Sequence, residues 1–91
     1  MMFRRDKIVY HCWVYVYDSN GKKLFSKFYE TIRQSSARRI MNRITRHYWR
    51  KHRDEGDNDT RVHGAWDATL GAFDRFLESE DDPTYFKRHF Y

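Results

Sequence analysis

The sequence predicts an α+β fold for one domain spanning residues 1–91, in which an antiparallel β-hairpin packs on two α-helices. A third strand is expected if the C-terminal tail joins the sheet. Three observations indicate this fold. Residues 7–30 hold two β-rich runs around Asn20-Gly21, a strong hairpin signal. Residues 31–53 and 62–80 repeat apolar side chains at helical spacing. The chain has 91 residues, and its aromatic content of 19% supplies the core area that few aliphatic side chains provide.

The hairpin is compatible with two registers. A two-residue turn pairs Tyr17 with Leu24, whereas a type I turn with Gly21 in a left-handed bulge pairs Val16 with Leu24. We favour the second because it separates aliphatic from aromatic side chains. The aliphatic face then holds Ile8, Cys12, Val14, Val16, Leu24 and Phe28. The aromatic and basic face holds His11, Trp13, Tyr15, Lys23, Phe25, Lys27 and Tyr29.

A basic helix is predicted over residues 31–53, capped by Thr31, in a capping box with Gln34, or by Ser35 or Ser36. Its buried stripe consists of Ala37, Ile40, Met41, Ile44 and Tyr48. The opposite side carries an arginine ridge, which we define as Arg39, Arg43, Arg46, Arg50 and Arg53. At 1.5 Å per residue this ridge is about 21 Å long. Arg38, Lys51 and His52 widen it.

The rest of the chain is acidic. Residues 54–61 read as a polar loop, and residues 62–80 as a helix with acidic side chains on its outer face. The core stripe predicted for this helix is Val62, Trp66, Leu70, Phe73 and Leu77. Its acidic stripe is Asp67, Asp74 and Glu78. Residues 84–91 are too aromatic for a free end, so we expect them to dock on the core as a short helix or an added strand.

Charge is distributed unevenly along the chain. The formal net charge is +5, but residues 1–53 carry +11 and residues 54–91 carry −6. The sequence has no run of 18 apolar residues, which predicts no membrane span, and its start lacks the apolar stretch of a secretory signal. The single cysteine, Cys12, lies among alternating apolar residues and is expected to be a buried, inert thiol. Together these features favour the cytoplasm.

The sequence argues against catalysis. It contains no glycine-rich phosphate loop and no nucleophile elbow. His47 and His52 point in different directions on a helix, and the acidic loop departs from the calcium-loop pattern. A metal-dependent nuclease built from His63 with Asp57 or Asp59 is the remaining, disfavoured alternative. We therefore predict no enzyme activity, no catalytic residue, no metal and no cofactor.

Nucleic-acid binding has better support. Aligned arginines repel one another unless an anion lies against them, and phosphates suit the planar guanidinium group. Aromatic side chains interleaved with cations are also typical of surfaces on which bases stack. The candidate site is therefore Arg38, Arg39, Arg43, Arg46, Arg50, Lys51 and Arg53 on the helix, with Trp13, Tyr15, Lys23, Phe25 and Lys27 on the sheet. Two alternatives stay open. The sheet aromatics could form a second core under the tail, and the acidic stripe could neutralise the ridge within the fold or across a homodimer.

The hairpin also carries a family resemblance. The stretch Trp13-Val14-Tyr15-Val16-Tyr17-Asp18-Ser19-Asn20-Gly21-Lys22-Lys23, followed by Lys27-Phe28-Tyr29-Glu30-Thr31, resembles the sheet-and-helix DNA-binding domains of phage-type integrases and of the AP2 class. The resemblance covers about 25 of the 91 residues and implies that Trp13, Tyr15, Lys23, Phe25 and Lys27 face the major groove. The chain departs from the pattern in that an alanine follows the capping threonine only at Ala37, and the second helix has no counterpart.

The sequence thus predicts a small non-enzymatic accessory or regulatory protein that binds DNA or RNA. The alternative is a protein-binding inhibitor or adaptor of phage or mobile-element type that blocks a host machine. Small size, segregated charge and many aromatic residues fit this role as well, because Trp, Tyr and Arg are the usual hot spots of protein interfaces.

Overall fold

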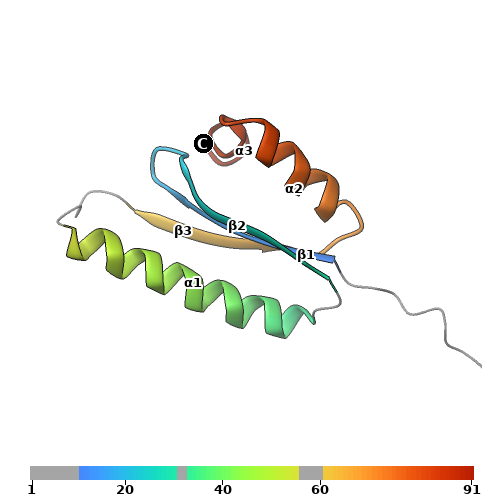
Figure 1. The fold of residues 1–91 in the computed structure, drawn as a ribbon, viewed down its shortest axis with the longest axis horizontal. Helices are drawn as coiled ribbons and strands as arrows, with labels where there is room; N and C mark the ends of the chain where they lie inside the picture. Colours follow the sequence, from blue (N-terminus) through green and yellow to red (C-terminus); the bar gives the residue numbers. More distant parts are fainter. Residues whose placement is uncertain (1–10, 31–32, 56–60) are drawn as a thin grey trace, which may run out of the picture.

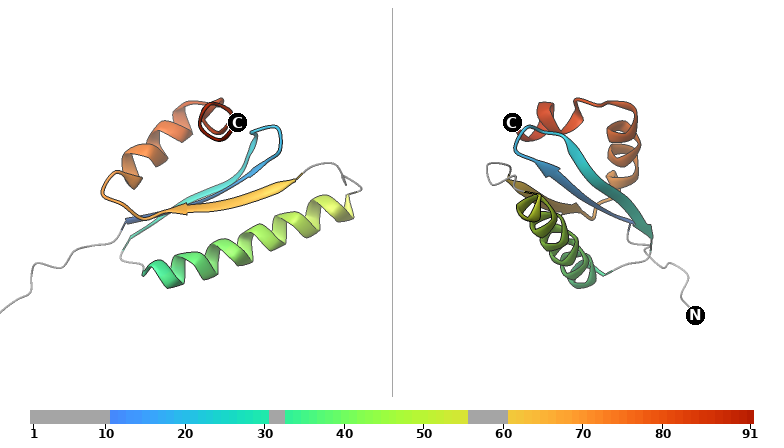
Figure 2. Two further views of the ribbon diagram at one scale, coloured as in Figure 1. Left: turned by 180° about the vertical axis from the view of Figure 1, so that it is seen from behind. Right: turned by 60° about the vertical axis from the view of Figure 1, so that its left-hand side comes forward.

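The computed structural model describes residues 11–30, 33–55 and 61–91. Its elements are β1 (His11–Asp18), β2 (Lys23–Glu30), α1 (Gln34–Asp54), β3 (Val62–Asp67), α2 (Ala72–Asp81) and α3 (Tyr85–Phe90). The strands form one antiparallel sheet in the order β2-β1-β3. One face of the sheet is covered by α1, and the other face by α2 and α3 (Figure 1, Figure 2). The predicted α+β class is confirmed, and the third strand comes from residues 62–67 rather than from the tail.

The turn between β1 and β2 has the left-handed glycine that the favoured register predicts. The Gly21 N–H donates to the Asp18 carbonyl at 3.0 Å, and the φ angle of Gly21 is +83°. Only glycine adopts this φ without strain. Beside the turn, Tyr17 pairs with Lys23, as the favoured register predicts.

The register then shifts by one residue between Val16 and Tyr17. Tyr17 pairs with Lys23 and Val16 pairs with Phe25, so Leu24 is an extra residue in β2 and the predicted pairing of Val16 with Leu24 is wrong. A shift of one residue turns every following side chain to the other face of the sheet. The bulge therefore reverses the faces predicted for most of β2.

The faces of β1 are as predicted, whereas those of β2 are exchanged. Phe28 lies opposite Trp13 and packs with the aromatic residues rather than with the aliphatic ones. Phe25, Lys27 and Tyr29 lie opposite the aliphatic residues of β1. Paired residues of antiparallel strands share a face, so these three side chains lie on the α1 side of the sheet. Ile8, which was assigned to the aliphatic face, lies outside the described residues.

The basic helix, α1, is 21 residues long. Arg33 is its N-cap residue and makes no side-chain capping hydrogen bond. Capping by Ser35 or Ser36 is therefore wrong, since both lie within the helix, and Thr31 lies outside the described residues. The predicted buried stripe is confirmed for three of its five residues, because Ala37 is buried and Met41 and Ile44 pack beside it.

Residues 62–67, predicted as the first turns of a helix, form β3 instead. This strand pairs antiparallel with β1 and makes β1 the central strand. Val62 and Trp66 are spaced for one helix face, but with Gly64 they also fit the period of a strand, and Val and Trp favour strands. Gly64 allows α1 to approach closely, because a Cβ at this position would overlap the Oγ1 atom of Thr45.

Helix α2 is shorter than predicted, and a different stripe of it faces the sheet. Ala72 is buried, and Phe76 packs against the aromatic residues of the sheet. Three members of the predicted core stripe are exposed instead: Leu70 to 91%, Phe73 to 43% and Leu77 to 44%. The side of α2 that meets the sheet is formed by Ala72 and Phe76 instead, although the ring of Phe73 still lies 4.9 Å from that of Phe28.

Two apolar layers flank the sheet, and they differ in composition. The layer under α1 is aliphatic and contains Cys12, Val14 and Ala37. The layer under α2 and α3 is aromatic and contains Trp13, Tyr15, Ala72, Tyr85 and Phe86. The tail therefore docks on the core as a short helix, one of its two predicted forms. Burial raises the pKa of the Cys12 thiol to about 11, so the thiol stays protonated near neutral pH.

Candidate nucleic-acid interface

The arginine ridge lies on the outer side of α1. All five of its arginines are exposed, as are Arg38 and Lys51 beside them. Ala37, Met41 and Ile44 face the sheet, and the helix period of 3.6 residues turns the ridge to the opposite side. The predicted basic helix thus presents its cations to solvent along about 21 Å.

The ridge has little compensating charge within the described part of the chain. Arg53 lies 3.8 Å from Asp54, measured between Nε and Oδ1, and its Cζ lies 4.7 Å from the centre of the Trp49 ring. Among the described residues, no carboxylate is within ion-pair distance of the other four ridge arginines. These four cations are therefore available to an external anion.

The acidic helix does not neutralise the ridge, because α1 and α2 lie on opposite faces of the sheet (Figure 2). The acidic side chains pair with cations of their own layer instead. Asp67 pairs with Arg75, and Glu78 lies 3.7 Å from both Arg88 and His89. An ion-pair seam between the two helices, one of the alternatives left open by the sequence, is therefore wrong for contacts within the chain.

The sheet part of the predicted site is divided between two layers. Trp13 is only 1% exposed and Tyr15 7%. The ring of Trp13 lies 5.7 Å from that of Tyr85 and 6.0 Å from that of Phe86. Both sheet aromatics are thus core residues under the tail, and their assignment as exposed stacking residues is wrong. Lys23 pairs with Glu80 of α2, so it does not belong to the α1 side either.

Phe25 and Lys27, in contrast, lie on the same face of the sheet as α1. The ring centres of Phe25 and Tyr48 are 6.1 Å apart, so Phe25 of β2 contacts the second half of α1. Lys27 is exposed, and its Nζ lies 5.2 Å from the centre of the Tyr29 ring. Two of the five predicted sheet residues therefore share the α1 face of the sheet, and Phe25 is the one with a ring contact to the helix. The faces of β2 could not be predicted correctly, because no sequence pattern indicates the bulge at Leu24.

The first turn of α1 extends the positive surface. It contains no acidic residue, and its N–H groups have no side-chain cap. A pocket of about 320 Å³ beside it is lined by Gln34, Ser35, Arg38 and Trp66. The exposed N–H groups and the helix dipole give this end of α1 a partial positive charge. Arg38 therefore adds to the positive potential on the side of α1 that faces β3.

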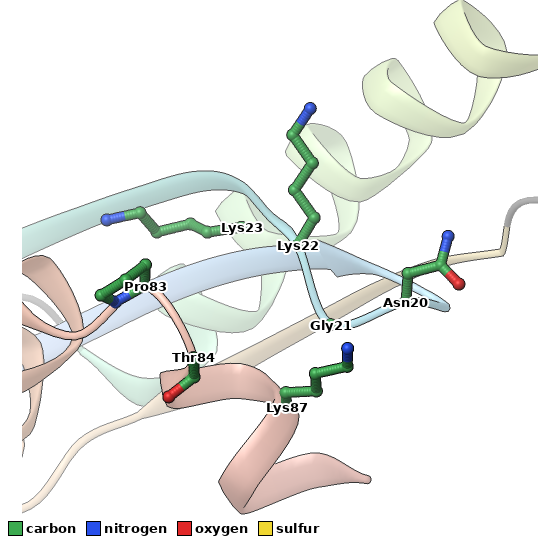
Figure 3. A pocket seen from close by; sticks show the side chains of 7 residues that line it. All are labelled: Asn20, Gly21, Lys22, Lys23, Pro83, Thr84 and Lys87. Atoms are coloured by element: carbon green, nitrogen blue, oxygen red, sulfur yellow. The ribbon is translucent and has the colours of Figure 1, made fainter.

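A second basic feature lies away from α1. A pocket of about 410 Å³ is lined by residues of the hairpin turn and of the start of α3, and three of these residues are lysines (Figure 3). They are Lys22, Lys23 and Lys87. Lys22 and Lys87 are not among the residues predicted for the site. No local pattern connects two positions so far apart in the chain, so the sequence carried no signal for this pocket.

Two further findings concern other classes of site. Within residues 11–30, 33–55 and 61–91, no helix is both long and apolar enough to cross a bilayer. In the same residues, no group of three or more His, Cys, Asp or Glu side chains could hold a metal ion. Comparison of the chain with protein-family models, with curated proteins and with solved structures gave no match.

Proposed function

We propose that this protein is a small, non-enzymatic nucleic-acid-binding protein with an accessory or regulatory role. The observation that supports the proposal is the arginine ridge of α1. All five of its arginines are exposed, and α1 lies on the face of the sheet opposite to the acidic helix α2 (Figure 2). Phosphate groups supply the missing negative charge, and a guanidinium group can hold a phosphate through two parallel hydrogen bonds.

Backbone contacts dominate the proposed binding mode. Trp13 and Tyr15, the side chains best suited to stacking on bases, are enclosed in the core. The ridge instead offers regularly spaced cations along a straight helix, which suits the regularly spaced phosphates of a duplex. We therefore infer that a duplex is bound at least as tightly as either of its single strands.

Fluorescence anisotropy with a labelled duplex and with each of its strands, at about 50 and about 200 mM salt, tests the proposal. Five phosphate contacts predict a slope of log K against log salt of about −4 to −5 for the duplex. Failure of both DNA and RNA to bind at about 50 mM salt would contradict nucleic-acid binding itself. Tighter binding of the single strands would contradict only the backbone mode.

A second candidate function, as a protein-binding inhibitor or adaptor, is favoured by one observation. Leu70, in the turn before α2, and Phe73 and Leu77 on α2 are large apolar side chains that are exposed, and exposed apolar side chains in one region fit an interface. Affinity capture from a nuclease-treated host lysate, with the wild type and with Leu70→Ser/Leu77→Ser, tests this function. A partner that survives nuclease and is lost with the serines supports it, whereas recovery of the same proteins with both chains contradicts it.

A further inference from the structure

We propose that the pocket between the hairpin turn and α3 binds the phosphate group of an anionic ligand. The pocket, of about 410 Å³, is lined by Asn20, Gly21, Lys22, Lys23, Pro83, Thr84 and Lys87 (Figure 3). This volume falls within the range of about 300–1,000 Å³ that is usual for small-ligand sites. No residue of α1 lines it, so the proposal does not depend on the arginine ridge.

The turn that forms one wall is held rigidly by Asp18. The buried Oδ1 atom of Asp18 accepts hydrogen bonds from the N–H groups of Asn20 and Lys22, both at 2.9 Å. The N–H of Asp18 donates to the carbonyl of Lys22 at 3.0 Å, and its carbonyl accepts from Gly21. The carboxylate of Asp18 is thus turned into the loop, and the backbone that carries Lys22 is fixed on both sides.

The other wall, formed by α3, is fastened to this turn. A Cβ built on Gly21 would lie 3.0 Å from the Cα of Lys87, which shows how closely the two backbones approach. The Tyr91 hydroxyl donates to the carbonyl of Asp18 at 2.6 Å. A pocket with two mutually fixed walls is preorganised, so a ligand loses less affinity to ordering of the protein.

Two of the three lysines of the pocket have no ion-pair partner among the described residues. Lys23 pairs with Glu80 of α2, whereas Lys22 and Lys87 have no ion-pair partner among the described residues. The nearby carboxylate of Asp82 is already occupied, since it accepts hydrogen bonds from Thr84 and Arg88. The free positive charge is therefore not cancelled at the rim.

In the structure only Lys87 extends its ammonium group toward the opposite wall, so a ligand that bridges the two walls requires Lys22 to change its side-chain conformation (Figure 3). Figure 3 shows the ammonium group of Lys87 pointing toward the turn, while Lys22 and Lys23 extend away from each other. The flexible four-carbon stem of Lys22 allows its ammonium group to swing over the opening, and lysine binds phosphate as a point charge. Two such charges, one on each wall, suit a phosphate group either of a small ligand or of a nucleic-acid backbone.

A titration of the full chain with inorganic pyrophosphate, followed by ¹H–¹⁵N NMR at constant ionic strength, tests the proposal. We expect the amide signals of Gly21, Lys22 and Lys87 to shift in a saturable way. Lys22→Gln/Lys87→Gln should weaken binding at least about tenfold, as expected for two lost ionic contacts. Arg33→Gln, which removes an exposed cation at the start of α1, should leave the affinity unchanged.

A labelled duplex then identifies the source of the phosphate. If the pocket takes backbone phosphates, the double variant also weakens duplex binding and reduces the salt slope by about 2. If it takes a small ligand, the double variant loses pyrophosphate but binds the duplex as the wild type does. Chemical-shift changes confined to α1 would contradict the proposed binding site. An equal affinity of the double variant and the control variant for pyrophosphate would contradict it as well. Neither result would bear on the proposed role of the arginine ridge.

Discussion

The two helical layers of this protein use the same sheet for different purposes. The α2–α3 layer buries aromatic rings, and several of its charges pair within the layer, as Asp67 does with Arg75 and Asp82 with Arg88. The α1 layer is built around Cys12, Val14 and Ala37, and four of its five ridge arginines have no ion-pair partner among the described residues. The comparison teaches that the buried aromatic cluster and the arginine ridge, which come from neighbouring parts of the sequence, lie on opposite sides of the sheet. One layer serves mainly stability, and we propose that the other serves binding.

The largest effect is expected from Trp13→Ala. Trp13 contacts rings from both α2 and α3, and its Nε1 donates to Ser26 Oγ at 2.6 Å. Removing such a buried ring costs about 3–5 kcal/mol in free energy of unfolding, which urea denaturation would measure. If Trp13→Ala kept near-wild-type stability but bound nucleic acid more weakly, Trp13 would belong to the binding surface. The division between a stabilising layer and a binding layer would then be wrong.

The next effect concerns the other layer. Replacing Arg43, Arg46 and Arg50 together by Ala should weaken duplex binding about 100-fold and reduce the magnitude of the salt slope by about 3. The free energy of unfolding should change little, because these side chains are exposed and have no ion-pair partner among the described residues. Anisotropy titrations at several salt concentrations measure both quantities.

Arg88→Gln is the control for this experiment, since it removes a guanidinium group from the α3 side. It should alter the duplex affinity far less than Arg46→Gln does. Equal losses from the two single variants would mean that only net charge matters, and that the α1 face has no special role.

A smaller effect is expected from Gly21→Ala in the hairpin turn. The φ of +83° disfavours any residue with a Cβ, and the added methyl group would press on the backbone of Lys87. We expect a loss of about 1–3 kcal/mol in free energy of unfolding, measured by thermal or urea denaturation. Asn20→Ala provides the comparison, because Asn20 is exposed and contributes its backbone N–H to the turn. Equal losses from the two variants would contradict the role of the glycine.

The smallest effect is a dependence on acid pH at the start of α3. Hydrogen bonds from Thr84 and Arg88 lower the pKa of Asp82 to about 2, from an ordinary value of 3.8. A carboxyl group whose pKa is lower in the folded state contributes stability above its ordinary pKa, and this contribution is lost as the pH falls through the folded value. The wild type should therefore lose slightly more stability than Asp82→Asn between about pH 4 and pH 2. Parallel curves for the two proteins would contradict the assignment.

Local signals in the sequence predicted about half of this architecture. The Asn20-Gly21 turn and the basic helix depend on neighbouring residues, so both could be located from spacing alone. The ridge was equally predictable, because a helix that buries Ala37 and Met41 must expose the arginines on its other side.

The remaining features depend on contacts between distant parts of the chain. Val62 and Trp66 fit a strand and a helix equally well, and their pairing with β1 decided between the two. The bulge at Leu24 places Lys27 on the α1 face of the sheet. The packing of α3 against Trp13 makes this residue part of the core. None of these outcomes follows from a pattern within one segment.

The contact between Gly64 and Thr45 has a consequence for how the arginines are presented. Thr45 Oγ1 is enclosed without a hydrogen-bond partner among the described residues, and no room exists there for even one methyl group. The separation between α1 and β3 is therefore set by a residue that has no side chain. A larger residue at position 64 would lift the middle of the helix and carry Arg46 outward with it. Under the proposed function, the position of the arginines relative to a phosphate backbone is therefore set from the far side of the helix, by a residue that the proposed ligand does not contact.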